Sequence, residues 1–172
     1  MRLLNRMSEA ELPLCLLFNR MNHRRLISRA FAIVSRLGDG VFWYSIILAL
    51  PFLYGTQAVG ASLHMIVVGL VSLAIYKWLK TRTTRPRPYR IHDDILQNVR
   101  ALDEYSFPSG HTMHAVGFTL VLLSYYPEWW VLVVPFAALV AISRLVLGLH
   151  YPSDVLVGAT IGASIALVSI QL

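Results

Sequence analysis

The chain alternates between long apolar stretches and short polar connections. Five stretches are apolar enough to be membrane-spanning helices, namely 41–54, 58–76, 112–126, 129–147 and 155–172. A bilayer core about 30 Å thick needs about 20 helical residues, so the first and third stretches are short for a span. Tyrosine and tryptophan stand at several ends of these stretches, as is typical of the lipid–water interface. The pattern predicts an all-α, polytopic membrane bundle.

The first 38 residues have a different pattern. Apolar residues between Leu26 and Leu37 recur at helical spacing, and arginines lie between them. This arrangement predicts one or two amphipathic helices that lie on the membrane surface. We therefore expect a single domain over 1–172, with interfacial helices over 1–38 and a transmembrane core over 39–172. The core has five spans, or six if the N-terminal helices also enter the membrane.

The composition agrees with a membrane protein and excludes several other classes. Of the 172 residues, 56% are hydrophobic and only 14% are charged, and the mean hydropathy is +0.60. Soluble domains are about 25% charged, so too few charged residues remain here to cover a water-facing surface. The high apolar fraction also excludes a disordered chain. The single cysteine, Cys15, excludes a disulfide framework and a cluster of cysteine metal ligands.

The net charge of +6 is compatible with binding to a nucleic acid, an anionic lipid or a phosphorylated substrate. The placement of the charges separates these possibilities. With five spans, all 15 Lys and Arg residues fall on one face of the membrane, in the N-terminal segment and the connections 77–111 and 143–154. The other face carries only Glu128. Charges that are concentrated in this way do not form a diffuse basic surface for a nucleic acid.

The two basic connections also hold the groups that phosphoryl transfer needs. They supply cations, a hydroxyl, an approachable glycine, two histidines and a carboxylate: Lys80, Arg87, Ser109, Gly110, His111, Arg144, His150 and Asp154. Arginine presents a planar fork that matches phosphate oxygens, and a helix that begins after Ser109 would offer backbone N–H groups to an anion. A double-displacement phosphatase needs two histidines, one to attack phosphorus and one to protonate the leaving oxygen. His150 and Asp154 are four residues apart, so on a helix they would share a face.

These residues fall into three motifs that resemble those of the type 2 phosphatidic acid phosphatase (PAP2) superfamily. The first motif, K-x6-R-P, is matched by Lys80, Arg87 and Pro88. The second motif, P-S-G-H, is matched by Pro108, Ser109, Gly110 and His111. The third motif, S-R-x5-H-x3-D, is matched by Ser143, Arg144, His150 and Asp154. Every motif position is filled without substitution, and each motif lies beside a predicted span.

The resemblance implies an integral membrane lipid phosphatase that acts through a phosphohistidine, without a metal or another cofactor. His150 would be the nucleophile, Asp154 would orient it, and His111 would be the general acid and then the base that activates water. The remaining motif residues would bind the phosphate oxygens: Lys80, Arg87, Ser109, Gly110 and Arg144. The family's substrates include phosphatidylglycerol phosphate, undecaprenyl diphosphate, phosphatidic acid and lipid A 1-phosphate, and the sequence does not choose among them.

Two other functions and the orientation in the membrane stay open at this point. One alternative is a vanadate-binding, haloperoxidase-like enzyme, although such relatives are soluble. The other is a membrane transport or scaffold protein with an unused site. The family resemblance implies a bacterial inner-membrane protein with its site on the periplasmic face, whereas the excess of basic residues beside the motifs favours the cytoplasmic face. The sequence does not indicate an oligomeric state.

The connection between the first two motifs has a helical pattern of its own. Ile91, Ile95, Leu96, Val99 and Leu102 are spaced so that a short amphipathic helix is expected within 89–107. This segment either borders the substrate entrance or is a simple connector. Three further cations near the first motif either attract an anionic head group or are solvated loop charges: Arg82, Arg85 and Arg90.

Overall fold

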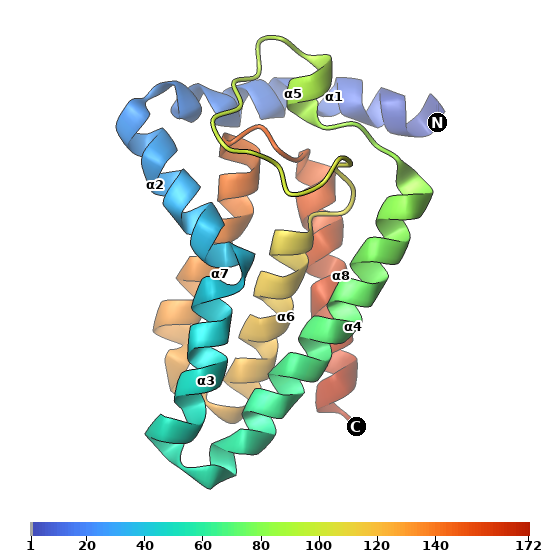
Figure 1. Cartoon of the computed structure of the whole chain (residues 1–172). Coiled ribbons are helices and arrows are strands. Elements are labelled where there is room, and N and C mark those ends of the chain that lie inside the picture. Colours follow the sequence, from blue (N-terminus) through green and yellow to red (C-terminus); the bar gives the residue numbers. More distant parts are fainter. Residues whose placement is uncertain (1) are drawn as a thin grey trace.

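The computed structural model describes residues 2–172, with side chains from Met7 onward, and the regular structure in this part of the chain is entirely helical (Figure 1). The α-helices are α1 (Arg2–Asn19), α2 (Arg25–Arg36), α3 (Phe42–Tyr54), α4 (Val59–Thr83), α5 (Pro88–Ile91), α6 (Gly110–Tyr125), α7 (Trp130–Val146) and α8 (Pro152–Ile170). Short 3-10 or π segments join several of them: η1 (Arg20–His23), η2 (Leu37–Val41), η3 (Thr56–Ala58) and η4 (Pro127–Trp129). The predicted all-helical bundle is confirmed.

The bundle has the surface of a membrane protein. Four helical runs are long and apolar enough to cross a membrane: Arg25–Tyr54, Thr56–Ile91, Pro127–Val146 and Pro152–Ile170. The remaining predicted span, 112–126, corresponds to α6, which has 16 residues and packs against α4, α7 and α8 at the centre of the bundle. The outer faces of the surrounding helices expose large apolar side chains, among them Leu48, Phe52, Val131 and Leu156. A soluble protein rarely exposes so much apolar surface. The number of spans stays a prediction.

The helical run from Arg25 to Tyr54 bends at η2. Gly40 adopts φ = 130° at this bend, a conformation that glycine takes far more readily than other residues. A Cβ atom at Gly38 would lie 2.8 Å from Val140 of α7, so α7 packs directly against the bend. The predicted boundary between the interfacial segment and the core falls at this bend, which separates α2 from α3. The location of 1–38 on the membrane surface stays a prediction.

Small residues bring α8 close to α6 and so align the starts of the two helices. A Cβ atom at Gly158 would lie 2.5 Å from the backbone oxygen of Ser109, and one at Gly162 would overlap the backbone oxygen of Met113. Such a close approach of two backbones is typical of small residues at membrane helix interfaces. As a result, the backbone N–H of Ser109 donates to the backbone oxygen of Asp154 at 3.0 Å.

The segments that carry the three motifs gather at one end of the bundle (Figure 1). The helix α1 lies across this end and contacts α5, α7 and α8. The turns at η3 and η4 and the C-terminus lie at the opposite end. This arrangement confirms the predicted sorting of the connections onto two sides of the bundle.

The prediction of an amphipathic helix within 89–107 is wrong beyond α5, because 92–109 is an irregular loop. Its backbone is held by amide side chains of the N-terminal segment instead. Asn19 accepts a hydrogen bond from the N–H of Leu96 at 2.8 Å, and Asn19 and Asn22 both donate to the Leu96 carbonyl. Ile95 is buried in a cluster with Cys15 and Tyr151. Hydrogen bonds from the asparagine side chains and the burial of Ile95 therefore hold this segment as a loop, in place of the helix that the spacing predicted.

Candidate active site

The two cations of the first motif converge on one carboxylate. Lys80 lies in the last turn of α4, Arg87 lies directly before α5, and both side chains are buried. Lys80 Nζ contacts Asp103 Oδ1, and Arg87 Nη2 donates to the same oxygen at 2.8 Å. Tyr76 donates its hydroxyl to Asp103 Oδ2. A loop carboxylate that was not predicted from the sequence thus holds two of the cations expected to bind phosphate.

These contacts keep Asp103 ionised. Burial opposes the charge of this carboxyl, but the hydrogen bonds from Lys80 and Tyr76 outweigh burial and lower the pKa of Asp103 below its usual value. The Asp103 side chain is 29% exposed, so it lies at the edge of the cluster. A phosphate dianion that binds Lys80 and Arg87 must therefore displace Asp103 or share the two cations with it.

Replacing Asp103 with asparagine is expected to lower the KM for a phosphorylated substrate about five-fold and to leave kcat nearly unchanged. The reason is that asparagine keeps the shape of the side chain but no longer competes as an anion for Lys80 and Arg87. The size corresponds to about 1 kcal/mol, the upper end for a partly exposed ion pair. Glu104→Gln is the matched control, because Glu104 is 63% exposed and pairs with the surface cation Arg90. An unchanged or higher KM in Asp103→Asn would contradict this prediction.

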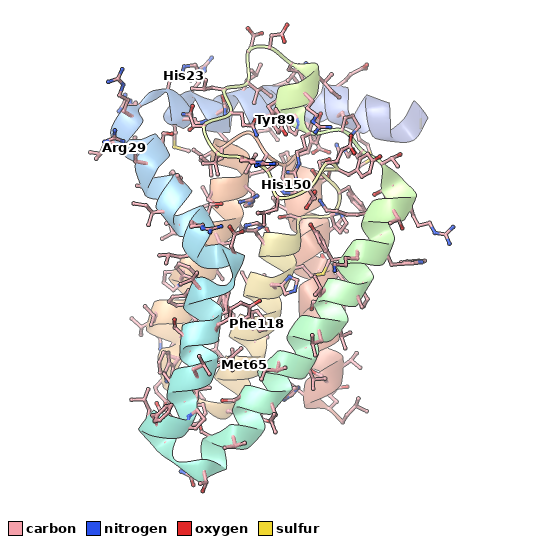
Figure 2. All side chains as sticks on the ribbon, in the orientation of Figure 1. His23, Arg29, Met65, Tyr89, Phe118 and His150 are labelled. Carbon is pink, nitrogen blue, oxygen red and sulfur yellow. The ribbon has the colours of Figure 1, made fainter. Side chains whose placement is uncertain are left out.

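His150 is buried beside Arg87 at the end of the bundle, and Figure 2 shows it beneath Tyr89 of α5. Arg87 Nη1 lies 3.2 Å from His150 Nε2. A guanidinium can only donate hydrogen bonds, so Nε2 must accept, and the proton of the neutral ring then sits on Nδ1. Burial, followed by the nearby cations Arg87 and Arg144, holds the pKa of His150 well below its usual value. The ring is therefore neutral at neutral pH, and the electron pair of its unprotonated Nε2 accepts the hydrogen bond from Arg87.

Asp154 lies on the Nδ1 side of the His150 ring, but the helical explanation for this pairing is wrong. His150 precedes α8, which begins at Pro152, a residue favoured at the first position of a helix. Asp154 Oδ2 caps α8 by accepting the N–H of Tyr151 at 2.8 Å, and it lies 3.6 Å from His150 Nδ1. That separation exceeds a hydrogen bond, and Nδ1 has no hydrogen-bond partner in the part of the chain that the structure describes.

Arg85 is a buried partner of Asp154, which corrects the interpretation of Arg85 as a solvated loop charge or an anion-attracting cation. Its side chain is 1% exposed, and Nη1 donates to Asp154 Oδ1 at 2.7 Å. Its guanidinium also lies 3.7 Å from Glu11 of α1 and stacks over the Tyr151 ring at 4.0 Å. Arg85 therefore holds the carboxylate that faces His150 and connects it to the N-terminal helix.

The remaining motif residues line the same region. Arg144, in the last turn of α7, is buried and donates from Nη1 to Ser35 of α2. Its Nε–H is buried without a hydrogen-bond partner among residues 7–172, so Arg144 has a donor left for an anion. Ser109 is the residue before α6, and its hydroxyl lies 3.0 Å from that of Thr112. Gly110 follows it in the first turn of α6, whose N–H groups have no partner within the helix.

His111 lies in the first turn of α6, and its partner comes from outside the three motifs. The ring Nε2 contacts Oδ1 of Asp39, which is located in the bend η2. The two side chains are only 11% and 15% exposed. No sequence spacing relates residues so far apart in the chain, and the one available signal for Asp39 was a lone carboxylate at the start of an apolar stretch.

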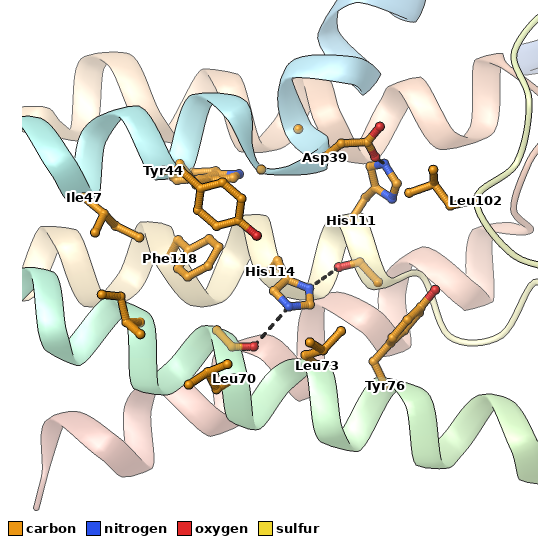
Figure 3. Close-up of a pocket in the computed structure, with 16 residues that line it drawn as sticks. Asp39, Tyr44, Ile47, Leu70, Leu73, Tyr76, Leu102, His111, His114 and Phe118 are labelled. Atoms are coloured by element: carbon orange, nitrogen blue, oxygen red, sulfur yellow. Dashed lines mark hydrogen bonds and ion pairs between the residues drawn. The ribbon is translucent and has the colours of Figure 1, made fainter.

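A mainly apolar cavity of about 270 Å³ extends from His111 between α3, α4 and α6 (Figure 3). Asp39, His111 and Tyr76 lie at one end of the cavity, and apolar side chains such as Ile47 and Phe118 line the other. His114 also lines it, but its ring nitrogens lie within hydrogen-bond distance of the backbone oxygens of Gly110 and Gly69. Among the described residues, no group of three or more His, Cys, Asp or Glu side chains is arranged to hold a metal ion.

Comparison with known proteins establishes the family. Residues 61–172 match the family model described as the PAP2 superfamily, and this match covers more than half of the chain. The chain belongs to the PAP2 superfamily. The resemblance drawn from the three motifs is thereby confirmed, and with it the class of enzyme, because relatives are named as phosphatases.

Individual relatives of this PAP2 chain agree with that assignment. An undecaprenyl-diphosphatase of Sulfolobus acidocaldarius is 27% identical over 161 residues, which are 91% of this chain and 76% of that protein. The crystal structure of Aquifex aeolicus LpxE superimposes with a TM-score of 0.75 and 27% identity, over 91% of this chain and 93% of the other. A transmembrane PAP2 type phosphatidylglycerolphosphate phosphatase from Bacillus subtilis gives a TM-score of 0.75 at 24% identity, over 99% and 86% of the two chains, and supports the fold alone. Other relatives named as lipid phosphatases match over only about half of their length.

Proposed function

We propose that this PAP2 protein hydrolyses a phosphomonoester or a terminal diphosphate of a lipid through a phosphohistidine on His150. The observation that best supports this function is the state of the buried His150 ring. Its Nε2 accepts from Arg87, so the atom that would attack phosphorus is unprotonated and lies beside a cation that would bind the phosphate. Asp154 lies on the opposite side of the ring, where it would stabilise positive charge that develops on the imidazole.

The reaction would proceed in two balanced steps. In the first step, a bond forms between His150 Nε2 and phosphorus while the bond from phosphorus to the lipid oxygen breaks, and His111 gives a proton to that oxygen. In the second step, a water oxygen attacks phosphorus, the N–P bond breaks, and His111 takes a proton from the water. Inorganic phosphate then leaves and both histidines return to their starting states. No step of this scheme uses a metal ion.

Three fixed cations would stabilise the charge on the phosphoryl oxygens. Arg87 and Lys80 are held together by Asp103, and Arg144 has a buried Nε–H that has no hydrogen-bond partner among residues 7–172. The N–H groups at the start of α6, together with Ser109 and Gly110, would complete the binding site. Preorganised donors of this kind are worth about 3–4 kcal/mol each in the transition state.

The apolar cavity supports a lipid as the substrate. It connects His111 with the apolar side chains of α3, α4 and α6, so a phosphate at the cations would leave the attached chain among apolar groups. We also propose that the site faces the periplasm of a bacterial inner membrane, as the family resemblance implies. Labelling of a cysteine introduced at the exposed Asp94 from outside intact cells tests this orientation, because the native Cys15 is buried.

The function is tested by phosphate release from the purified protein in detergent. We expect release from at least one of undecaprenyl diphosphate, phosphatidylglycerol phosphate, phosphatidic acid and lipid A 1-phosphate, and continued release in the presence of EDTA. Glycerol 3-phosphate, which carries a phosphomonoester but no apolar chain, should be a much poorer substrate. The proposal fails if no lipid phosphate is hydrolysed, and the lipid assignment fails if the water-soluble ester is hydrolysed equally well.

A further inference from the structure

An ionisable carboxylate lies inside a helical run that is long and apolar enough to cross the membrane. Asp39 is in the bend η2 of the run Arg25–Tyr54, and its side chain is 15% exposed. A charge at such a position is costly and usually has a functional partner. Here the partner is His111, whose Nε2 contacts Asp39 Oδ1. Figure 3 shows the carboxylate directed at the ring from the α3 side of the cavity.

The fold presents Asp39 to His111 through an unusual backbone. The carboxylate stands between Gly38 and Gly40 in the bend η2, where the non-helical backbone of Gly40 separates α2 from α3. Gly40 supplies the positive φ of the bend. Gly38 has no side chain, so the bend can pack directly against Val140 of α7.

Other charged groups lie near Asp39 and His111, but the contact between these two side chains is the main interaction of each. Arg36 Nη1 lies 3.4 Å from Asp39 Oδ2, but its side chain is 76% exposed, so this pair contributes little. Arg144 of α7 interacts electrostatically with both Asp39 and His111, and His114 of α6 interacts with His111. Among the described residues, Asp39 is therefore the carboxylate that contacts the second histidine of the site.

We propose that Asp39 is the positioning residue of His111. An ionised carboxylate can only accept, so Asp39 fixes the proton of Nε2 and leaves Nδ1 as the nitrogen that exchanges protons with the leaving oxygen and with water. It also stabilises the imidazolium that must exist before the leaving group is protonated, as the aspartate of a Ser-His-Asp triad does for its histidine. The role of His111 as acid and base rests on the proposed function. The new inference is that Asp39 is its partner and that Nδ1 is the nitrogen that exchanges protons.

The test compares two leaving groups in Asp39→Asn. With a lipid phosphate, whose leaving oxygen needs a proton, we expect turnover to fall about 10²–10⁴-fold, the usual contribution of a general acid. With p-nitrophenyl phosphate, whose leaving group departs without a proton, formation of the phosphohistidine should be nearly unaffected. Only its hydrolysis should slow, so the variant should show a burst of nitrophenol of about one equivalent followed by a slow steady rate.

A double-variant comparison and a matched control complete the test. If Asp39 acts through His111, then Asp39→Asn combined with His111→Ala is no slower than His111→Ala alone. Asp94→Asn removes a carboxylate from an exposed loop position and should leave the turnover of both substrates unchanged. Absence of the nitrophenol burst in Asp39→Asn, additive losses in the double variant, or wild-type turnover of the lipid phosphate in Asp39→Asn would each overturn the proposal. Absence of phosphate release by the wild-type protein would instead refute the proposed function.

Discussion

Replacing His150 with alanine is expected to abolish phosphate release, with a loss on the order of 10⁶-fold in kcat, as when a nucleophile is removed from another covalent hydrolase. The neighbouring Arg87 and Arg144 could not substitute, because they are cations that bind oxygen and have no electron pair to offer. The measurement is phosphate release from the best lipid substrate at saturating concentration. A rapid alkaline quench of the wild-type protein should also trap phosphate on the chain, and His150→Ala should trap none.

The expected loss can be separated from a loss of folding. His150 is 2% exposed, so His150→Gln is a useful second variant that keeps most of the side-chain volume but has no imidazole. His64→Ala is the matched control, because His64 lies at the opposite end of the bundle and contacts Tyr125 and Ser169 there. Thermal unfolding in detergent reports whether each variant folds. Substantial turnover in either folded His150 variant would place the nucleophile on another residue.

The bundle and the cluster of motif residues could be predicted from the sequence because both depend on local patterns. Apolar stretches with aromatic ends predict membrane helices regardless of how the helices pack. The sorting of connections onto two sides then brings Lys80, Arg87, Arg144 and His150 to one end, although the motifs are far apart along the chain. The composition of these segments is enough to indicate phosphate chemistry, because cations and histidines are concentrated in them.

The parts of the site that could not be predicted depend on tertiary contacts. Asp103 comes from an irregular loop in which helical spacing was misleading, since Asn19 and Asn22 satisfy its backbone. Asp39 reaches His111 only because η2 bends beside α6. The pairing of His150 with Asp154 was expected for the wrong reason. Pro152 between them disfavours helix in the preceding residue, and this signal was available in the sequence.

Arg85→Met is expected to destabilise the protein by about 3–5 kcal/mol, the usual cost of removing one partner from a buried ion pair. The Arg85 and Asp154 side chains are 1% and 0% exposed, and their atoms lie 2.7 Å apart. Methionine fills much of the same volume but leaves the Asp154 carboxylate buried without its counter-charge. It also removes the donors that bind Ser8 of α1 and Ser153 of α8. The measurement is the midpoint of thermal unfolding in detergent, compared with wild type.

The stability loss should depend on the charge left behind, and this distinguishes it from a packing defect. Arg82→Met, at an exposed position of the same basic segment, should change stability little. In Arg85→Met combined with Asp154→Asn, part of the loss should be recovered, because the uncompensated charge is gone. If the double variant is instead as unstable as the sum of the single ones, Arg85 acts mainly through its packing on Tyr151 and its bonds to α1. Recovery would show that the carboxylate facing His150 is tolerated in the interior only while Arg85 neutralises it.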